Sequence, residues 1–543
     1  MTTSCQEKKT RQSREQIKSR VDFMLFQQGF SLIVHDDFFL VNHPDGHPCV
    51  MRVWKSSSKT DFELVACGRV RYNTSRNVMN IQPKFTPVLD PAFVAPVLWN
   101  KAFADKVAAT PGSHTVDLAL TRLDGTCFRW SGKILPQEGE NVALNNQYIE
   151  RIVKFLLWMK GGCTIMVAGD DQIADMLAAT YCAGGAREFD WDFIGKKIYD
   201  QPIQVVKVAS AADLPAENST SVSLGRNLDG YRIGFDLGGS DRKCAAVVNG
   251  EVVFSEEVVW DPYHQTDPMY QLEGVDDSLL RAAKHLPQVD AIGGSAAGVY
   301  VNSEPRVGSL FRGISPEDFQ NVIRGMFGTL KDRWSERMGK EVPFEVVNDG
   351  EVTALAGAMG MNDDAVLGIA MGTSLAAGYV DPEGHIMPWL NELAFVPVDY
   401  QEDGGVDEWS KDKGVGAMYF SQQAVARLAP RAGFEFGSMP YPEQLKKVQA
   451  AMAEGDDRAR KIYETIGVEF GYTIAYFADF YDVRNLLFLG RVATGDGGQL
   501  IIDKANEVLK AEFPQLNITL CVPDEKTKRH GQAVAAASLP KLG

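Results

Sequence analysis

Every second residue from Tyr231 to Leu237 is apolar, which predicts a β-strand with one buried face. Asp236 falls on the other face, next to the end of this strand. Gly238 and Gly239 follow directly, and glycine lets a backbone turn sharply and approach a ligand closely. The pattern therefore predicts a carboxylate beside a glycine turn with exposed N–H groups, a combination that suits metal-bound phosphate.

The chain then returns as two further β-rich runs, residues 243–248 and 251–260, joined by the hairpin signal Asn249-Gly250. Strands and helices alternate from there on, and a second glycine-marked hairpin is expected at residues 366–380. The other expected strands are 289–293, 344–347, 485–489 and 517–522, and the expected helices are 277–285, one capped by Ser315 that runs to Met338, 351–359, a mainly helical stretch 414–481, 499–512 and a last helix near Gly531. Two strand–helix blocks that each open on a hairpin predict an α/β protein with two lobes around a cleft, residues 230–345 and 346–543.

Residues 210–229 separate these lobes from the first part of the chain. They are rich in Ser, Asn, Ala, Asp and Pro and lack an apolar period, so we expect a linker. Residues 1–209 are expected to form an additional α+β domain whose role the sequence does not indicate. Its expected elements are a helix at 13–28, strands at 38–41 and 49–54, a helix at 146–160 stopped by Gly161-Gly162, a strand at 163–167, a helix at 171–181 and a strand at 204–208.

Composition narrows the class of protein. The formal net charge of −16 argues against a general nucleic-acid binder, and no apolar tract approaches the roughly 20 residues of a membrane span. The polar N-terminus lacks the apolar core of a secretory signal, so a cytoplasmic location is expected. The eight cysteines contain no C-x-x-C pair and are expected to be reduced, and His43, His47 and Cys49 fit surface positions better than any zinc spacing.

Phosphoryl transfer asks a protein for backbone donors, a carboxylate that holds Mg²⁺ and a group that orients the attacking hydroxyl. Asp236 and Asp349, each at the end of a predicted strand, and the two glycine turns offer these groups. Arg242 or Lys243 could add a cation, or both could be ordinary surface residues. Each feature is weak alone, because an Asp at a strand end more often caps the next helix. Their order and spacing together are more specific.

The same segments give a resemblance to a known family. Residues 231–543 resemble the ROK family of sugar kinases and regulators, within the actin-like ATPase superfamily of ribonuclease H-like fold. The matching segments are 233–239 for the first phosphate motif, 347–351 with 354–356 for the Asn-Asp segment, 372–374 with Gly378 for the second phosphate motif, 391–395 for the Gly-Glu-x-Gly-His segment, and 531–537 for the closing helix. The resemblance implies a two-lobed kinase-like part after the N-terminal domain.

Several family residues are changed. Phe395 replaces the family's zinc-binding histidine, and residues 409–416 replace its cysteine cluster, so no zinc is expected. The expected Pro-Gly is Ala296-Ala297-Gly298, and residues 308–313 lack the sugar-contacting Asn. In the adenosine segment a glycine pair becomes Gly490-Arg491, where the arginine could stack on the adenine, shield it or obstruct it.

The leading hypothesis is an ATP- and Mg²⁺-dependent kinase of a small sugar or polyol, with Asp349 as the general base. Asp236 would hold Mg²⁺ through water. The resemblance places the acceptor at Asn348 and Glu392, and the nucleotide at Asp236, Gly238, Gly239, Ser240, Gly372, Thr373, Ser374, Gly490 and Arg491. The alternatives are a non-catalytic, ligand-sensing regulator of the ROK type and an ATPase or kinase with a non-sugar acceptor. We expect no nucleic-acid or membrane partner, and a homodimer stays possible.

Overall fold

The computed structural model describes residues 79, 81–218, 224–522 and 525–542, together with four strands nearer the N-terminus. The chain divides into two units, residues 1–72 with 175–188 and the remaining residues, and each unit is described by itself. The first unit holds an antiparallel sheet of β1 (Ser31–His35), β2 (Phe38–Asn42), β3 (Pro48–Val53) and β4 (Leu64–Ala66), in that order. The strands predicted at 38–41 and 49–54 are thus confirmed as β2 and β3. The helix predicted at 13–28 and the residues His43 and His47 lie outside the described part.

The second unit begins with a four-stranded sheet in the order β6-β5-β7-β8. Its hairpin forms because alternate residues of β5, among them Val116, Leu118 and Leu120, are buried. Gly161 ends helix α3 at a φ of 79°, a value that favours glycine, and this helix starts five residues earlier than predicted. The elements of this part of the chain are α2 (Pro96–Ala109), β5 (His114–Thr121), β6 (Cys127–Ile134), α3 (Asn141–Lys160), β7 (Thr164–Ala168), α4 (Asp171–Thr180), α5 (Glu188–Asp190), η1 (Trp191–Ile198) and β8 (Gln204–Lys207). Residues 175–180 of α4 and Glu188 of α5 belong to the first unit.

The next sheet has the order β11-β10-β9-β12-β15, an antiparallel hairpin followed by parallel strands. Its elements are β9 (Tyr231–Leu237), β10 (Asp241–Val248), β11 (Glu251–Val259), α6 (Met269–Ala283), β12 (Ala291–Ala296), β13 (Val299–Val301), β14 (Glu304–Val307), α7 (Pro316–Asp318), η5 (Phe319–Ile323), α8 (Met326–Met338) and β15 (Phe344–Asn348). The predicted continuous helix from Ser315 to Met338 is wrong. Ser315 caps it as expected, but a π-helical segment interrupts it and Gly325, which favours helix ends, precedes α8.

The last sheet, in the order β17-β16-β18-β19, repeats this arrangement of a hairpin followed by parallel strands. Its elements are α9 (Asp349–Met361), β16 (Val366–Met371), β17 (Leu375–Val380), η6 (Leu393–Phe395), α10 (Gln422–Ala432), α11 (Tyr441–Ala453), α12 (Asp457–Phe477), β18 (Asn485–Leu489), η8 (Arg491–Ala493), α13 (Gly495–Glu512), β19 (Thr519–Cys521) and α14 (Glu525–Ala537). The hairpin predicted at 366–380 and the strand at 485–489 are confirmed. No helix in the described residues is long and apolar enough to cross a bilayer.

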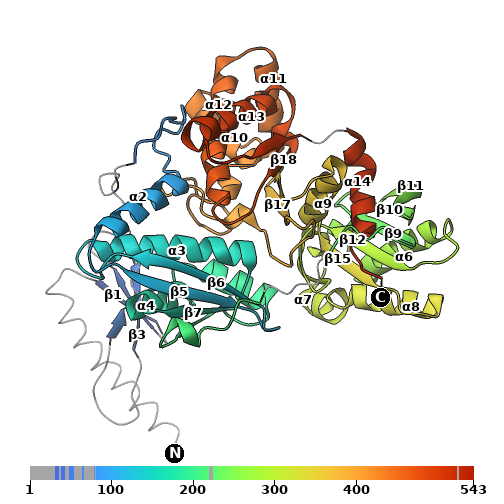
Figure 1. The fold of residues 1–543 in the computed structure, drawn as a ribbon, viewed down its shortest axis with the longest axis horizontal. Coiled ribbons are helices and arrows are strands. Elements are labelled where there is room, and N and C mark those ends of the chain that lie inside the picture. Colours follow the sequence, from blue (N-terminus) through green and yellow to red (C-terminus); the bar gives the residue numbers. More distant parts are fainter. Residues whose placement is uncertain are drawn as a thin grey trace, which may run out of the picture. The chain divides into compact units, whose positions relative to one another are not determined.

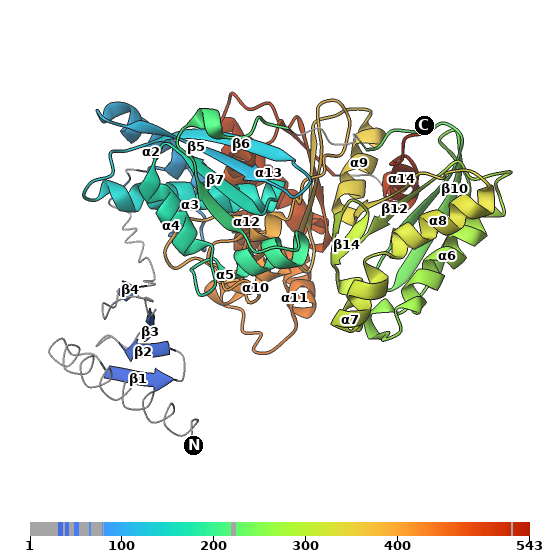
Figure 2. The same ribbon diagram turned by 90° about the horizontal axis from the view of Figure 1, so that it is seen from below.

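Helix α14, at the end of the chain, packs against the β9–β12 sheet rather than against the β16–β18 sheet. A Cβ at Gly234 or Gly293 would meet the carbonyl oxygen of Ala533 or Ala536 at 1.9 or 1.8 Å. The strand β9 is therefore covered on both faces, which explains why it is buried along almost its whole length. Helices α9 and α14 lie side by side between the two sheets (Figures 1 and 2). Helix α9 starts at the carboxyl end of β15 and packs against the second hairpin.

Candidate active site

Asp236 is the last residue but one of the buried strand β9 and is itself buried, at 8% exposure. Its Oδ1 accepts a hydrogen bond of 2.8 Å from Ser295, the residue opposite it on β12. The ammonium of Lys243 lies 3.7 Å from Oδ2 and 3.3 Å from Asp241. Burial raises the pKa of Asp236, while Ser295 and Lys243 counteract part of that rise. Lys243 is thus the cation next to Asp236, whereas Arg242 points away and pairs with Asp277 at 2.7 Å.

The turn after Asp236 uses one of its three predicted N–H donors internally. Gly238 donates to the carbonyl of Asp241 at 2.9 Å, and its own carbonyl accepts from the indole of Trp260 at 2.8 Å. These bonds fix the turn. Within the described residues no acceptor takes the N–H groups of Gly239 or Ser240, so two donors remain for a ligand.

The second hairpin turn has the same construction. Gly372 donates to the carbonyl of Ser374 at 3.0 Å, and its carbonyl accepts from Gln422 at the start of α10. Thr373 and Ser374 are exposed, and in the described part of the chain their N–H groups have no protein acceptor. In each hairpin the first glycine of the turn donates a hydrogen bond within the turn, and the next two residues present N–H groups that can bind a ligand.

Asp349 is the first residue of α9, directly after the end of β15. Asn348 caps this helix by accepting from Gly350 at 2.7 Å, and its amide donates to Gly298 at 2.7 Å. The side chain of Asn348, predicted to contact the acceptor, is therefore engaged in holding the start of α9. The pKa of Asp349 is raised to about 6, first by burial and then by the charge of Asp236.

The second hairpin abuts the start of α9. A Cβ at Gly378 would lie 2.2 Å from the carbonyl oxygen of Gly350, and one at Gly350 would lie 2.5 Å from that of Ala377. Only residues without side chains allow this approach. It places Asp349 beside the sheet that carries the second phosphate turn.

Glu392 completes a set of three carboxylates. Burial, followed by the charge of Asp349, raises its pKa to about 7. The charge of Asp236 raises the pKa of Asp349 in the same way, so the three acids form a series in which Asp349 lies between the other two. Acids with pKa values raised by burial and by a neighbouring charge are typical of functional sites.

The sequence reasoning missed a polar network behind Glu392. Asn391, in a left-handed conformation at φ 48°, donates to Glu351 at 2.6 Å and accepts from Tyr481 at 2.7 Å. The other carboxylate oxygen of Glu351 accepts from the N–H of Tyr379 at 3.0 Å, and burial raises the pKa of Glu351 to about 8. Glu351 lies two residues after Asp349 in the Asn-Asp segment, which is the signal that could have pointed to it.

Gly490 and Arg491 lie next to the second hairpin. Gly490 has a φ of 93°, and a Cβ there would lie 2.4 Å from the carbonyl oxygen of Met371. The adenosine segment therefore touches the strand that leads into the Gly372 turn. The Arg491 side chain is exposed, while its carbonyl accepts from Gln449 at 2.9 Å.

A magnesium ion fits the chemistry of Asp236, since its Oδ2 atom is a hard oxygen ligand whose one ion-pair partner among the described residues, the ammonium of Lys243, lies 3.7 Å away. No group of three or more potential metal ligands gathers in the described part of the chain. At the positions that the resemblance gives to zinc ligands, Phe395 and Trp409 pack against each other with ring centroids 5.5 Å apart.

No protein-family model matches the chain, and no curated protein does. Among solved structures it is similar to a ROK hexokinase from Thermus thermophilus (14% identity, TM-score 0.44, 56% of this chain and 96% of that one). It is also similar to a ROK family glucokinase from Streptomyces griseus, solved with glucose and AMPPNP (20% identity, TM-score 0.41, 58% and 100%). A third is a ROK family transcriptional regulator described as a homologue of the E. coli MLC protein (18%, TM-score 0.44, 57% and 79%). Both kinases and a transcriptional regulator are among these similar structures, so the similarity does not decide between the two functions. The proposed function therefore rests on the residues of the site.

Proposed function

We propose that this protein is an ATP-dependent, Mg²⁺-assisted kinase that phosphorylates a hydroxyl of a small sugar or polyol. The observation that carries the proposal is the convergence of Asp236, Asp349 and Glu392, with the second hairpin packed against the start of α9. Asp349 lies between the other two acids in this series, where its raised pKa suits a group that accepts a proton.

In this proposal Asp349 accepts the proton of the acceptor hydroxyl while the oxygen attacks the γ-phosphorus of ATP, and ADP leaves. A pKa of about 6 keeps Asp349 ionised at neutral pH yet more basic than an ordinary aspartate, as a general base requires. Glu392 accepts hydrogen bonds from the acceptor. When bound at Asp236, Mg²⁺ would offset the negative charge of the phosphates.

The two hairpins would hold the phosphate chain. The N–H groups of Gly239 and Ser240 on one side and of Thr373 and Ser374 on the other are fixed in advance by their turns. Donors that need no reorganisation stabilise charge more effectively than mobile ones. Gly490 and Arg491 would border the nucleoside.

The proposal is tested by ADP release from Mg·ATP with a panel of sugars, amino sugars and polyols. We expect at least one acceptor to stimulate ADP release and to yield a phosphorylated product that mass spectrometry detects. ADP release that no acceptor changes would identify an ATPase instead. A chain that binds a sugar without any turnover would favour the ligand-sensing alternative.

A further inference from the structure

Helix α3, which precedes both hairpin sheets in the chain, contacts the loop that carries Glu392. The N–H of Glu392 donates to the carbonyl of Trp158 at 3.0 Å, and the N–H of Asn391 donates to that of Met159 at 3.0 Å. Carbonyls in the last turn of a helix lack partners within the helix. The acceptor loop therefore completes the end of α3.

One turn earlier on the same helix, Lys154 is fully buried between two acids. Its ammonium lies 2.8 Å from Asp190 and 2.6 Å from Asp412, and all three side chains are at most 8% exposed. The indole of Trp158 donates to Asp190 at 3.0 Å. Because a buried charge needs its partners, such a lysine holds the segments that carry the two acids in place.

Asp412 lies in the loop that pairs with the chain just after Glu392. Val398 donates to Gly414 at 2.7 Å, and Gly416 donates to Val396 at 3.0 Å. Lys154 thus holds the segment of Asp412, which pairs with residues 396–398. The carbonyl groups at the end of α3 hold residues 391–392 directly.

A cluster of aromatic side chains lies at the same contact between α3 and the loop of Glu392. The ring of Trp158 lies 4.4 Å from that of Phe395, and Trp409 packs edge-on against Phe193 at 5.1 Å. Trp158, Phe193 and Phe395 are buried. Apolar packing and the ion cluster therefore fasten the loop to residues outside the hairpin sheets.

We infer that helix α3 is a built-in part of the acceptor site, and that Lys154 is a positioning residue that holds the loop of Glu392 in its binding geometry. The inference rests on the proposed function, because it assigns a role to the support of Glu392. It also gives a role to the region before residue 231, because α3 supplies part of the support of the loop that carries Glu392.

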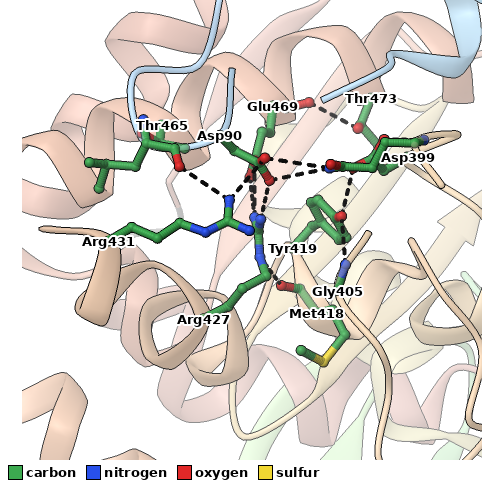
Figure 3. A network of polar contacts seen from close by, with 12 residues as sticks. Asp90, Asp399, Gly405, Met418, Tyr419, Arg427, Arg431, Thr465, Glu469 and Thr473 are labelled. Carbon is green, nitrogen blue, oxygen red and sulfur yellow. Dashed lines mark hydrogen bonds and ion pairs between the residues drawn. The ribbon is translucent and has the colours of Figure 1, made fainter. Parts of the chain in front are cut away.

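A matched control exists elsewhere in the same unit. Arg427 of α10 is also buried, and its guanidinium contacts Asp90 and lies 2.9 Å from Glu469 (Figure 3). Like the ion pair of Lys154 with Asp412, the ion pair of Arg427 with Asp90 links the part of the chain before residue 210 to the part after residue 400. Its hydrogen bonds within the described residues involve none of Asn391, Glu392 and Asp412, so its loss should leave the bonds between α3 and residues 391–392 in place.

The experiment compares Lys154→Met with Arg427→Met in the full-length protein. We expect both to lower the melting temperature, but only Lys154→Met to raise the acceptor KM, by about tenfold, while the ATP KM stays within about twofold. Hydrogen exchange should accelerate at the amides of residues 391–392 in Lys154→Met and remain slow in Arg427→Met.

Trp158→Phe is the second variant if Lys154→Met does not fold, since it removes the bond to Asp190 and keeps a ring against Phe395. It should show the same split between the two KM values to a smaller extent. Equal changes in both KM values, or unchanged exchange at residues 391–392, would overturn the inference. Lack of phosphoryl transfer in the unmodified protein would refute the proposed function instead, and the exchange comparison would still decide the role of α3.

Discussion

The phosphate side and the acceptor side of the site are built in different ways. Each phosphate turn is a run of three residues closed by its own backbone, as at Gly238 and at Gly372. The acceptor side depends on Glu392, whose loop is held by Glu351, Tyr481 and the end of α3. A turn closed partly by its own backbone depends on fewer parts of the chain than a loop that is held only by distant ones.

This difference has a consequence for how such a protein can change. Altering the support of Glu392 shifts the acceptor site and leaves the phosphate turns in place. The packing of Phe395 against Trp158 of α3 and against Trp409 is one such support. Acceptor specificity can therefore diverge while the nucleotide chemistry persists.

Among the substitutions that separate the two sides of the site, the largest effect is expected from Gly490→Ala. The new Cβ would lie 2.4 to 2.6 Å from three backbone atoms of Met371, at a positive φ, so the strand leading to the second turn has to shift. We expect ATP affinity to fall by more than tenfold and stability to fall by about 2 kcal/mol or more. Isothermal titration and thermal unfolding measure both.

Gly495→Ala is the control, because Gly495 has a positive φ of 66° but no atom within 4 Å of its Cβ position. It should cost only the backbone strain of about 1 kcal/mol and leave ATP affinity unchanged. Equal losses in both variants would mean that the contact with Met371 does not matter.

On the acceptor side, Glu392→Gln should raise the acceptor KM by about tenfold or more, because a charged hydrogen-bond acceptor becomes a neutral amide. The amide is close in size, so the loop should keep its place and the ATP KM should stay the same. Steady-state kinetics with each substrate varied in turn separates the two. A larger change for ATP would move Glu392 to the phosphate side.

The pH dependence sharpens the assignment of Asp349. Its pKa is raised to about 6, so the carboxylate that accepts the proton is lost as the pH falls through 6. In the Glu392→Gln variant, which removes the group that titrates near 7, kcat/KM should drop about tenfold per pH unit below 6. A flat profile between pH 5 and 8 would exclude Asp349 as the base.

The smallest effect is expected from Arg491→Ala. The side chain is exposed, and the backbone carbonyl makes the contact with Gln449. ATP affinity should change by less than about threefold, as for an exposed cation near a ligand. A rise in affinity would show that Arg491 obstructs the adenine, and a fall would show that it stacks on it.

The sequence predicts the two glycine-marked hairpins well because their signals are local. Alternation along β9, the glycine turns and the hairpin at 366–380 all lie within a few residues of one another. The prediction of one continuous helix from Ser315 to Met338 was wrong, because the helix is interrupted before Gly325 and α8 begins only after it. The contacts that hold the loop of Glu392 could not be predicted from the sequence. Trp158 and Lys154 fit the pattern of an ordinary amphipathic helix, and their partners in that loop are distant in the chain.

Asn348 shows the same limit at a single residue. The resemblance gives it to the acceptor, whereas its side chain caps α9 and bonds to Gly298. Its assignment to the acceptor stays a prediction. Glu351 went unassigned because nothing in its own segment shows that Asn391 will reach it.

The central claim is that Asp349 acts as a base between two phosphate turns, and Asp349→Asn tests it most directly. ATP binding and phosphoryl transfer are measured on the same preparation, by titration calorimetry and by product formation. We predict that transfer falls by about 10³-fold or more while the Kd for Mg·ATP stays within about threefold. Transfer at the rate of the unmodified protein would contradict the account.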